Sequence, residues 1–282
     1  MNPTRNVRPT VPALPLTVLC ILFGVSCVSI LAETKAGPRR AAAPASRPAG
    51  LDAKNLFKNG DFERGRDPWF DLQEAKKPYW HGFELTDSVA FHGTHSAHLS
   101  LESPATADKV AIHGVVQEVA PPERKDVKNG TTRREFPGTI SGNVRIENWT
   151  RRLPKEYLQF VVILWGKGLR DSNGSEVPNI QIRYILAGVT TPPFQISNGH
   201  FIFLRGAEPD GGAEPETGRW IHFERDLRKD WLEQWGFVPE HFEKIRCLFE
   251  VRFDDRAEAV PGHLADVYFD DLYIGPALST AR

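Results

Sequence analysis

From residue 54 onward the chain consists mainly of short segments in which apolar and polar residues alternate. Alternation with period two is typical of strands with one buried face, and Gly, Pro and Asn separate the segments. The predicted strands cover residues 55–58, 82–90, 96–102, 110–119, 139–147, 156–166, 178–188, 199–205, 219–225, 245–254 and 266–274. No regular exchange of strands and long helices occurs, so we expect an all-β fold, an antiparallel sandwich of two sheets.

One short helix is predicted over residues 226–236. Leu227, Trp231 and Trp235 recur every four residues, and Gly236 suits a left-handed C-cap. Long polar loops are expected at residues 120–138, 167–177 and 206–218. In a sandwich such loops gather at the ends of the strands, where binding sites often lie.

An uncharged apolar run at residues 11–32 follows Arg5 and Arg8. A basic start before an apolar run is typical of an export signal, but the length also permits a signal-anchor helix in a membrane, and Cys27 weakly resembles a lipoprotein cleavage site. We therefore predict a signal peptide or anchor at residues 1–32, an Ala/Pro/Arg-rich linker at 33–53, the domain at 54–277 and a tail at 278–282. Each alternative places the domain outside the cytoplasm: secreted, periplasmic or attached to a membrane.

Composition is that of an ordinary globular protein, with 40% hydrophobic and 25% charged residues. The formal net charge of -1 offers no basic field for nucleic acid, so no nucleic-acid partner is expected. Cys247 is the one cysteine after the apolar run, which holds Cys20 and Cys27. It lies in a strand-like segment, so we interpret it as a buried, unreactive thiol.

Four motifs occur in a fixed order along the domain, and together they resemble those of one family. They are Asn59-Gly60-Asp61-Phe62-Glu63 followed by Gly65 and Trp69; Gly93-Thr94-His95-Ser96 before a hydrophobic strand; Gly218-Arg219-Trp220; and Phe269-Asp270-Asp271-Leu272. This order resembles that of non-catalytic carbohydrate-binding modules of the galactose-binding-like jelly-roll type, over roughly residues 55–275. The resemblance implies a jelly-roll sandwich with a polysaccharide or glycan as its partner.

The resemblance also implies a structural calcium ion that ties the first strand region to the last. It carries this role onto Glu63 and Asp270, with Asp271 as a substitute. Calcium takes six to eight oxygen ligands, so carbonyls of the turn at residues 93–96 would have to contribute. The alternative is that Asp270 and Asp271 cap a turn or pair with arginines.

Sugar binding relies on exposed aromatic faces and a few planar polar groups. Tyr79 and Trp80 follow a charged segment and suggest an exposed loop, so Trp80 is the leading stacking residue. Gln181 and Arg183 lie on one face of a predicted strand, where they can recognise hydroxyls or carboxylates.

Two other functions stay open. A jelly-roll polysaccharide lyase or glycoside hydrolase would need paired carboxylates, and Glu250 and Asp254 share a strand face. An envelope or adhesion protein without a sugar ligand is the third alternative. We find no catalytic motif, so a non-catalytic role is favoured over an enzyme.

Overall fold

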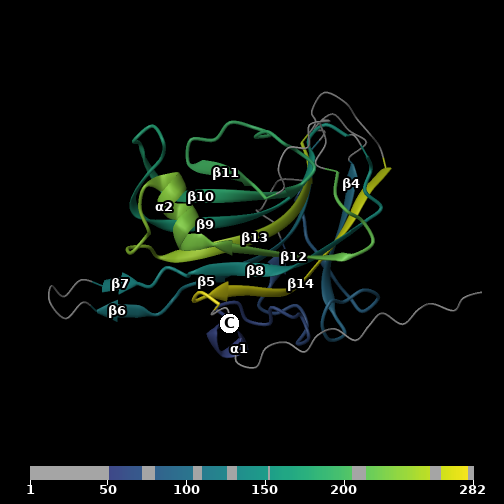
Figure 1. Cartoon of the computed structure of the whole chain (residues 1–282), viewed down its shortest axis with the longest axis horizontal. Coiled ribbons are helices and arrows are strands. Elements are labelled where there is room, and N and C mark those ends of the chain that lie inside the picture. The colour runs from purple at the N-terminus through teal and green to yellow at the C-terminus, as the bar shows by residue number, and fades with distance from the viewer. Residues whose placement is uncertain are drawn as a thin grey trace, which may run out of the picture. The chain divides into compact units, whose positions relative to one another are not determined.

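The computed structural model describes residues 51–71, 80–103, 110–125, 132–151, 153–204, 214–254 and 262–278 (Figure 1). Every described residue belongs to one compact unit, Pro44–Arg282. The predicted signal or anchor segment, most of the linker and most of the tail lie outside the described residues. Within them, no helix is long and apolar enough to cross a membrane.

The larger of the two main sheets has seven strands in the order β1-β5-β13-β9-β10-β11, with β2 also paired to β5. Their bounds are β1 Phe70–Asp71, β2 Trp80–His81, β5 Ala111–Val119, β9 Glu156–Arg170, β10 Glu176–Ala187, β11 Gly199–Phe203 and β13 Lys244–Phe253. The central strands β5, β13, β9 and β10 pair antiparallel, as expected for the predicted sandwich.

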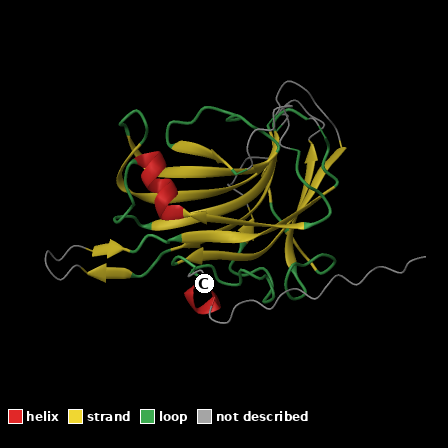
Figure 2. Cartoon of the chain, in the orientation of Figure 1, coloured by secondary structure: helices red, strands yellow, loops and turns green. Residues whose placement is uncertain are grey.

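The smaller main sheet has five strands in the order β12-β8-β14-β4-β3. Its strands are β3 Glu84–Thr86, β4 Ser96–Ser103, β8 Thr139–Glu147, β12 Trp220–Asp226 and β14 Gly262–Gly275. A separate ribbon of two strands, β6 Glu123–Lys125 and β7 Thr132–Arg134, extends beyond both sheets (Figure 1). Strands make up most of the described chain, and the helices α1 Leu51–Lys54 and α2 Leu227–Trp235 are short (Figure 2).

The core lies between the two main sheets and makes the fold a β-sandwich. The ring centroids of Phe249 in β13 and Phe269 in β14 are 5.3 Å apart. The ring of Phe160 in β9 stacks on that of Phe223 in β12, with 4.9 Å between their centroids. Cys247 is fully buried beside them, and burial raises the pKa of its thiol, so its interpretation as an unreactive core residue agrees with the structure.

The two ends of the domain lie against each other, as their motifs predict. Asn55 donates to the Leu272 carbonyl at 2.8 Å and accepts from the Ile274 amide at 3.0 Å. Backbone bonds join Leu56 to Ile274 and Gly60 to Leu272, so the end of β14 lies beside α1 (Figure 1). The predicted strand at 55–58 is wrong, however, because this segment bends, with the Phe57 amide donating to the side chain of Asn55 at 3.0 Å.

Three other features differ from the sequence prediction. The strand expected at residues 82–90 shortens to β3, and the loop expected at 120–138 contains the β6–β7 ribbon. The β10–β11 and β2–β5 pairs are parallel rather than antiparallel. Helix α2 is as predicted: Asp226 caps its start by accepting from the Lys229 amide, and Gly236 ends it at φ 78°.

Candidate ligand-binding face of the seven-stranded sheet

One face of the seven-stranded sheet lines the core, and the other points away from the second sheet. Phe160, Phe249 and Val251 belong to the main core, so the residues that alternate with them point outward. A separate apolar cluster occupies the middle of this outward face and consists of Val110, Ile112, Val116, Val161 and Leu248, with Trp80 and Ile163 packed against it. The polar residues described next flank this cluster on the same face.

Glu250 and Arg252 lie two residues apart in β13, so both point to the outward face. Gln159 of β9 is the cross-strand partner of Glu250, and its amide nitrogen donates to Glu250 Oε1. Arg252 Nη2 donates to the two oxygens of Asp254 at 3.0 and 2.9 Å, and its Nη1 donates to Glu250 at 3.4 Å. The Tyr157 hydroxyl donates to Asp254 Oδ2 at 2.5 Å. The result is a continuous hydrogen-bonded chain of charged and polar side chains over two neighbouring strands.

Arg183 enters this cluster from β10. Its Nη1 lies 3.5 Å from Glu250 Oε1, and only 11% of its side chain is exposed. Glu250, with 1% of its side chain exposed, is therefore shared by two guanidinium groups and one amide. Burial lowers the pKa of Arg183, although Glu250 works in the opposite direction. Burial also opposes the charge of Arg252, but Glu250, Tyr157 and Asp254 raise its pKa above the ordinary value.

Several buried polar atoms of this face have no hydrogen-bond partner among the described residues. They are Gln159 Oε1, Gln181 Oε1, Arg183 Nε and Arg252 Nε. Gln159 is fully buried and Gln181 is 6% exposed. Each unmade buried hydrogen bond costs about 1–3 kcal/mol of stability. A ligand with hydroxyl groups would offer both donors and acceptors to these atoms.

Phe194 lies over the two arginines. Its ring is 5.1 Å from the Arg183 guanidinium carbon and 5.5 Å from that of Arg252. A pocket of about 370 Å³ opens beside it and is lined by Lys155, Pro193, Phe194, Arg252 and Asp254. A half-buried aromatic ring beside a polar pocket provides both the stacking surface and the hydrogen-bonding groups of a sugar site.

The ligand residues expected from the sequence lie at different places on this face. Gln181 and Arg183 share it, as predicted, and Arg183 belongs to the polar cluster. Trp80 is the neighbour of Ile112 in register, and Ile112 is the neighbour of Arg252, so Trp80 lies about 10 Å from Arg252 at ordinary strand spacing. The expectation of an exposed loop at Trp80 is wrong, because it lies in β2 and packs half-buried on the apolar cluster. Tyr79 lies outside the described residues.

Sequence reasoning missed Gln159, Tyr157, Phe194 and Arg252 as members of the site. Gln159 begins a long apolar run, so its segment resembles an ordinary buried strand. A polar residue at an outward position of such a strand was the available signal. Phe194 comes from the connection between β10 and β11, and no local pattern places that loop over the sheet.

The predicted metal residues Glu63 and Asp270 both bind the turn at residues 91–95. Glu63 accepts hydrogen bonds from the Thr94 and His95 amides at 2.7 Å and from the Thr94 hydroxyl at 2.8 Å. Asp270 accepts from the amides of Phe91, His92 and Asp271 at 2.8, 3.0 and 2.6 Å. Burial raises the pKa of Asp270 to about 7, although these three hydrogen bonds act to lower it.

These contacts correspond to the turn-capping alternative, because the turn presents N–H donors to both carboxylates. The described residues contain no group of three or more His, Cys, Asp and Glu side chains arranged to hold a metal ion. A calcium ion here would need further oxygens from backbone carbonyls or water. Calcium binding by Glu63, Asp270 and Asp271 stays a prediction.

Comparison with known proteins finds similarity only at the level of structure. No family model matches the chain, and no curated protein matches its sequence. A xylan-binding domain of carbohydrate-binding module family 22 is 11% identical at a TM-score of 0.38, covering 79% of this chain and 96% of that domain.

The C-terminal family 22 module of Clostridium thermocellum Xyn10B is 13% identical at a TM-score of 0.38, covering 82% of this chain and 99% of the module. An endo-β-1,4-glucuronan lyase from the fungus Trichoderma reesei is 12% identical at 0.37, covering 79% of this chain and 94% of the lyase. The chain is thus similar to jelly-roll carbohydrate-binding modules and also to a polysaccharide-degrading enzyme. At these scores neither likeness carries a function over to this chain.

Proposed function

We propose that the chain is an exported, non-catalytic protein that binds a segment of polysaccharide on the outward face of the seven-stranded sheet. The observation that supports this most is the polar cluster of Gln159, Arg183, Glu250 and Arg252, together with Gln181 on the same face. These side chains are largely buried, yet within the described residues they lie on the face that points away from the second main sheet. Such a cluster costs stability, so a ligand is the physical reason to keep it.

The chemistry of the cluster suits hydroxyl-rich ligands. Planar amide and guanidinium groups form hydrogen bonds of fixed direction to hydroxyl groups. Phe194 offers an aromatic face beside them. Glu250 and Asp254 are the carboxylates that a hydrolase would need, and both are ion-paired with Arg252. This pairing favours a structural role for the two carboxylates over proton transfer. Export through the segment at residues 1–32 and a structural calcium at Glu63 and Asp270 complete the proposal.

The test begins with a glycan array probed with the full chain, followed by titration of the best ligand into the Phe194→Ala variant. Loss of one stacking contact should weaken binding by roughly tenfold, since aromatic contacts contribute about 0.5–1.5 kcal/mol beyond their burial. The melting temperature should change little because Phe194 is only partly buried and belongs to neither apolar cluster. Phe237→Ala, at a 42% exposed position that does not line this pocket, is the matched control and should bind normally.

Binding that is unchanged in Phe194→Ala would contradict the assignment of this face. Release of reducing ends, or of unsaturated ends, from any bound polysaccharide would replace the binding function with that of a hydrolase or a lyase.

A further inference from the structure

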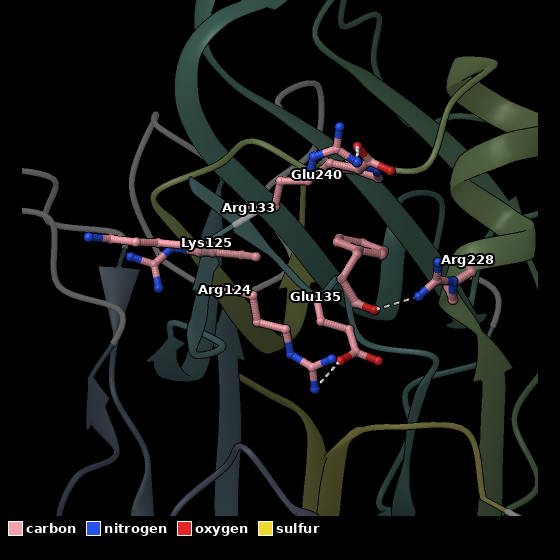
Figure 3. Close-up of a pocket in the computed structure, with 9 residues that line it drawn as sticks. Arg124, Lys125, Arg133, Glu135, Arg228 and Glu240 are labelled. Carbon is pink, nitrogen blue, oxygen red and sulfur yellow. Dashed lines mark hydrogen bonds and ion pairs between the residues drawn. The ribbon is translucent and has the colours of Figure 1, made fainter. Parts of the chain in front are cut away.

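A second pocket lies at the base of the β6–β7 ribbon. It shares no lining residue with the Phe194 pocket. It measures about 360 Å³ and is lined by Arg124, Lys125, Arg133, Arg134, Glu135, Phe136, Arg228, Pro239 and Glu240 (Figure 3). Five of these side chains are cationic and two are carboxylates. The chain as a whole has a formal net charge of -1, so this concentration of positive charge is local.

Arg134 builds the rigid part of this pocket. Its side chain is 19% exposed, and its guanidinium donates to the carbonyls of Phe242 at 3.1 Å and Pro121 at 2.6 Å and to Glu123 at 2.6 Å. Its backbone amide also donates to the Glu240 carbonyl at 3.0 Å. These bonds fix the base of the ribbon to the segment before β13, so the floor of the pocket is held in place.

The mouth is formed by cations that remain accessible. Arg124 pairs with Glu135 at 2.9 Å with 76% of its side chain exposed, and Arg133 pairs with Glu240 at 2.9 Å with 43% exposed (Figure 3). Lys125 is exposed and has no ion-pair partner among the described residues. Exposed pairs of this kind are weak, about 0–1 kcal/mol, so an incoming anion can exchange with the carboxylates.

We propose that this pocket binds an anionic group, carboxylate or sulfate, carried by a polysaccharide. Arginine forks recognise such planar or tetrahedral oxyanions. The choice of a polysaccharide as the carrier rests on the proposed function. Nucleic acid is the less fitting polyanion, because Phe136, the aromatic residue in the lining, is 2% exposed and offers no surface on which a base can stack.

The experiment compares the full chain with its Arg124→Gln/Lys125→Gln variant in titrations with dextran sulfate, polygalacturonate and uncharged dextran. The control is Arg219→Gln/Lys58→Gln, which removes the same two charges at exposed positions outside the pocket; Arg219, like Arg124, has an ion-pair partner. Binding to at least one charged polymer should weaken about tenfold in the pocket variant and less than about twofold in the control. Preference for the sulfated or the carboxylated polymer identifies which anionic group is bound.

Three outcomes overturn the proposal: equal weakening in both variants, absence of binding to both charged polymers, or tighter binding to single-stranded DNA of matched charge. Phe194→Ala separates this proposal from the function of the sheet face. If Phe194→Ala leaves binding of the charged polymer unchanged and the pocket variant weakens it, the pocket stands whether or not the sheet face binds sugar.

Discussion

Glu156, at the start of β9, is 1% exposed. Burial and then the negative charge of Glu214 raise its pKa to about 9, while the nearby backbone of Thr150 works in the other direction. In the unfolded chain the pKa of the same group is near its ordinary value of 4.5. The native state therefore keeps a proton that the unfolded state loses, and stability falls as pH rises from about 4.5 to about 9.

Glu156→Gln should flatten this dependence, because glutamine keeps the shape and cannot ionise. We expect the native protein to lose up to about 1.4 kcal/mol of unfolding free energy per pH unit through this group. Urea unfolding at several pH values between about 6 and about 8 measures the slope. Glu176→Gln, at an exposed position of β10, should keep the original slope. An identical slope in Glu156→Gln and the unchanged protein would contradict the protonated state.

Single residues also mark how far sequence reasoning reaches. Gln181 and Arg183 were predictable because both lie on one strand, where period two alone decides which face they share. The contact of Arg183 with Glu250 was not predictable, because it joins positions 67 residues apart through strand order. The exposed position expected for Trp80 failed for the same reason: only the register of β2 on β5 brings it onto an apolar cluster.

At the scale of elements, the turn at residues 91–95 is held by two carboxylates from opposite ends of the chain. Asp270→Ala should remove three hydrogen bonds to backbone amides and lower the unfolding free energy, by at most about 1–3 kcal/mol for each of these partly buried amides left unpaired.

Calcium adds a separate prediction for this turn. If Glu63 and Asp270 share an ion, chelator should lower the melting temperature of the unchanged protein and leave Asp270→Ala unaffected, because a ligand that binds only the native state stabilises it by mass action. Thermal melts in chelator and in excess calcium measure this. Coincident curves for the unchanged protein would mean that the carboxylates only cap the turn.

Long strands were predictable because alternation over many residues defines them; β8 has the predicted bounds, and β4 and β5 lie within one residue of theirs. Strands β1 and β2 have two residues each, too few for any period to appear. Direction is also invisible to alternation, which is why the parallel β10–β11 pair was missed. The ribbon of β6 and β7 is polar on both faces, so its segment resembles a loop.

At the scale of the whole molecule, the candidate site needs three neighbouring strands, β13, β9 and β10, whose sequence order is not their spatial order. Strand β13 lies between β5 and β9, and this arrangement brings Glu250 and Arg252 beside Tyr157 and Gln159. The sandwich then provides the rigid support on which polar groups can remain partly unpaired. We propose that these unpaired polar groups are kept to bind a ligand rather than to stabilise the fold.

Gln181→Leu tests that claim most directly, with Gln117→Leu as its control. Gln181 keeps a buried oxygen without a partner among the described residues. Gln117, also buried, is fully bonded to the Lys58 backbone at 2.8 and 3.0 Å. Titration calorimetry with the array-selected glycan and urea unfolding should show that Gln181→Leu loses binding at unchanged or higher stability. Gln117→Leu should keep binding and lose about 1–3 kcal/mol of stability. Full binding by Gln181→Leu together with a loss of stability like that of Gln117→Leu would contradict the account.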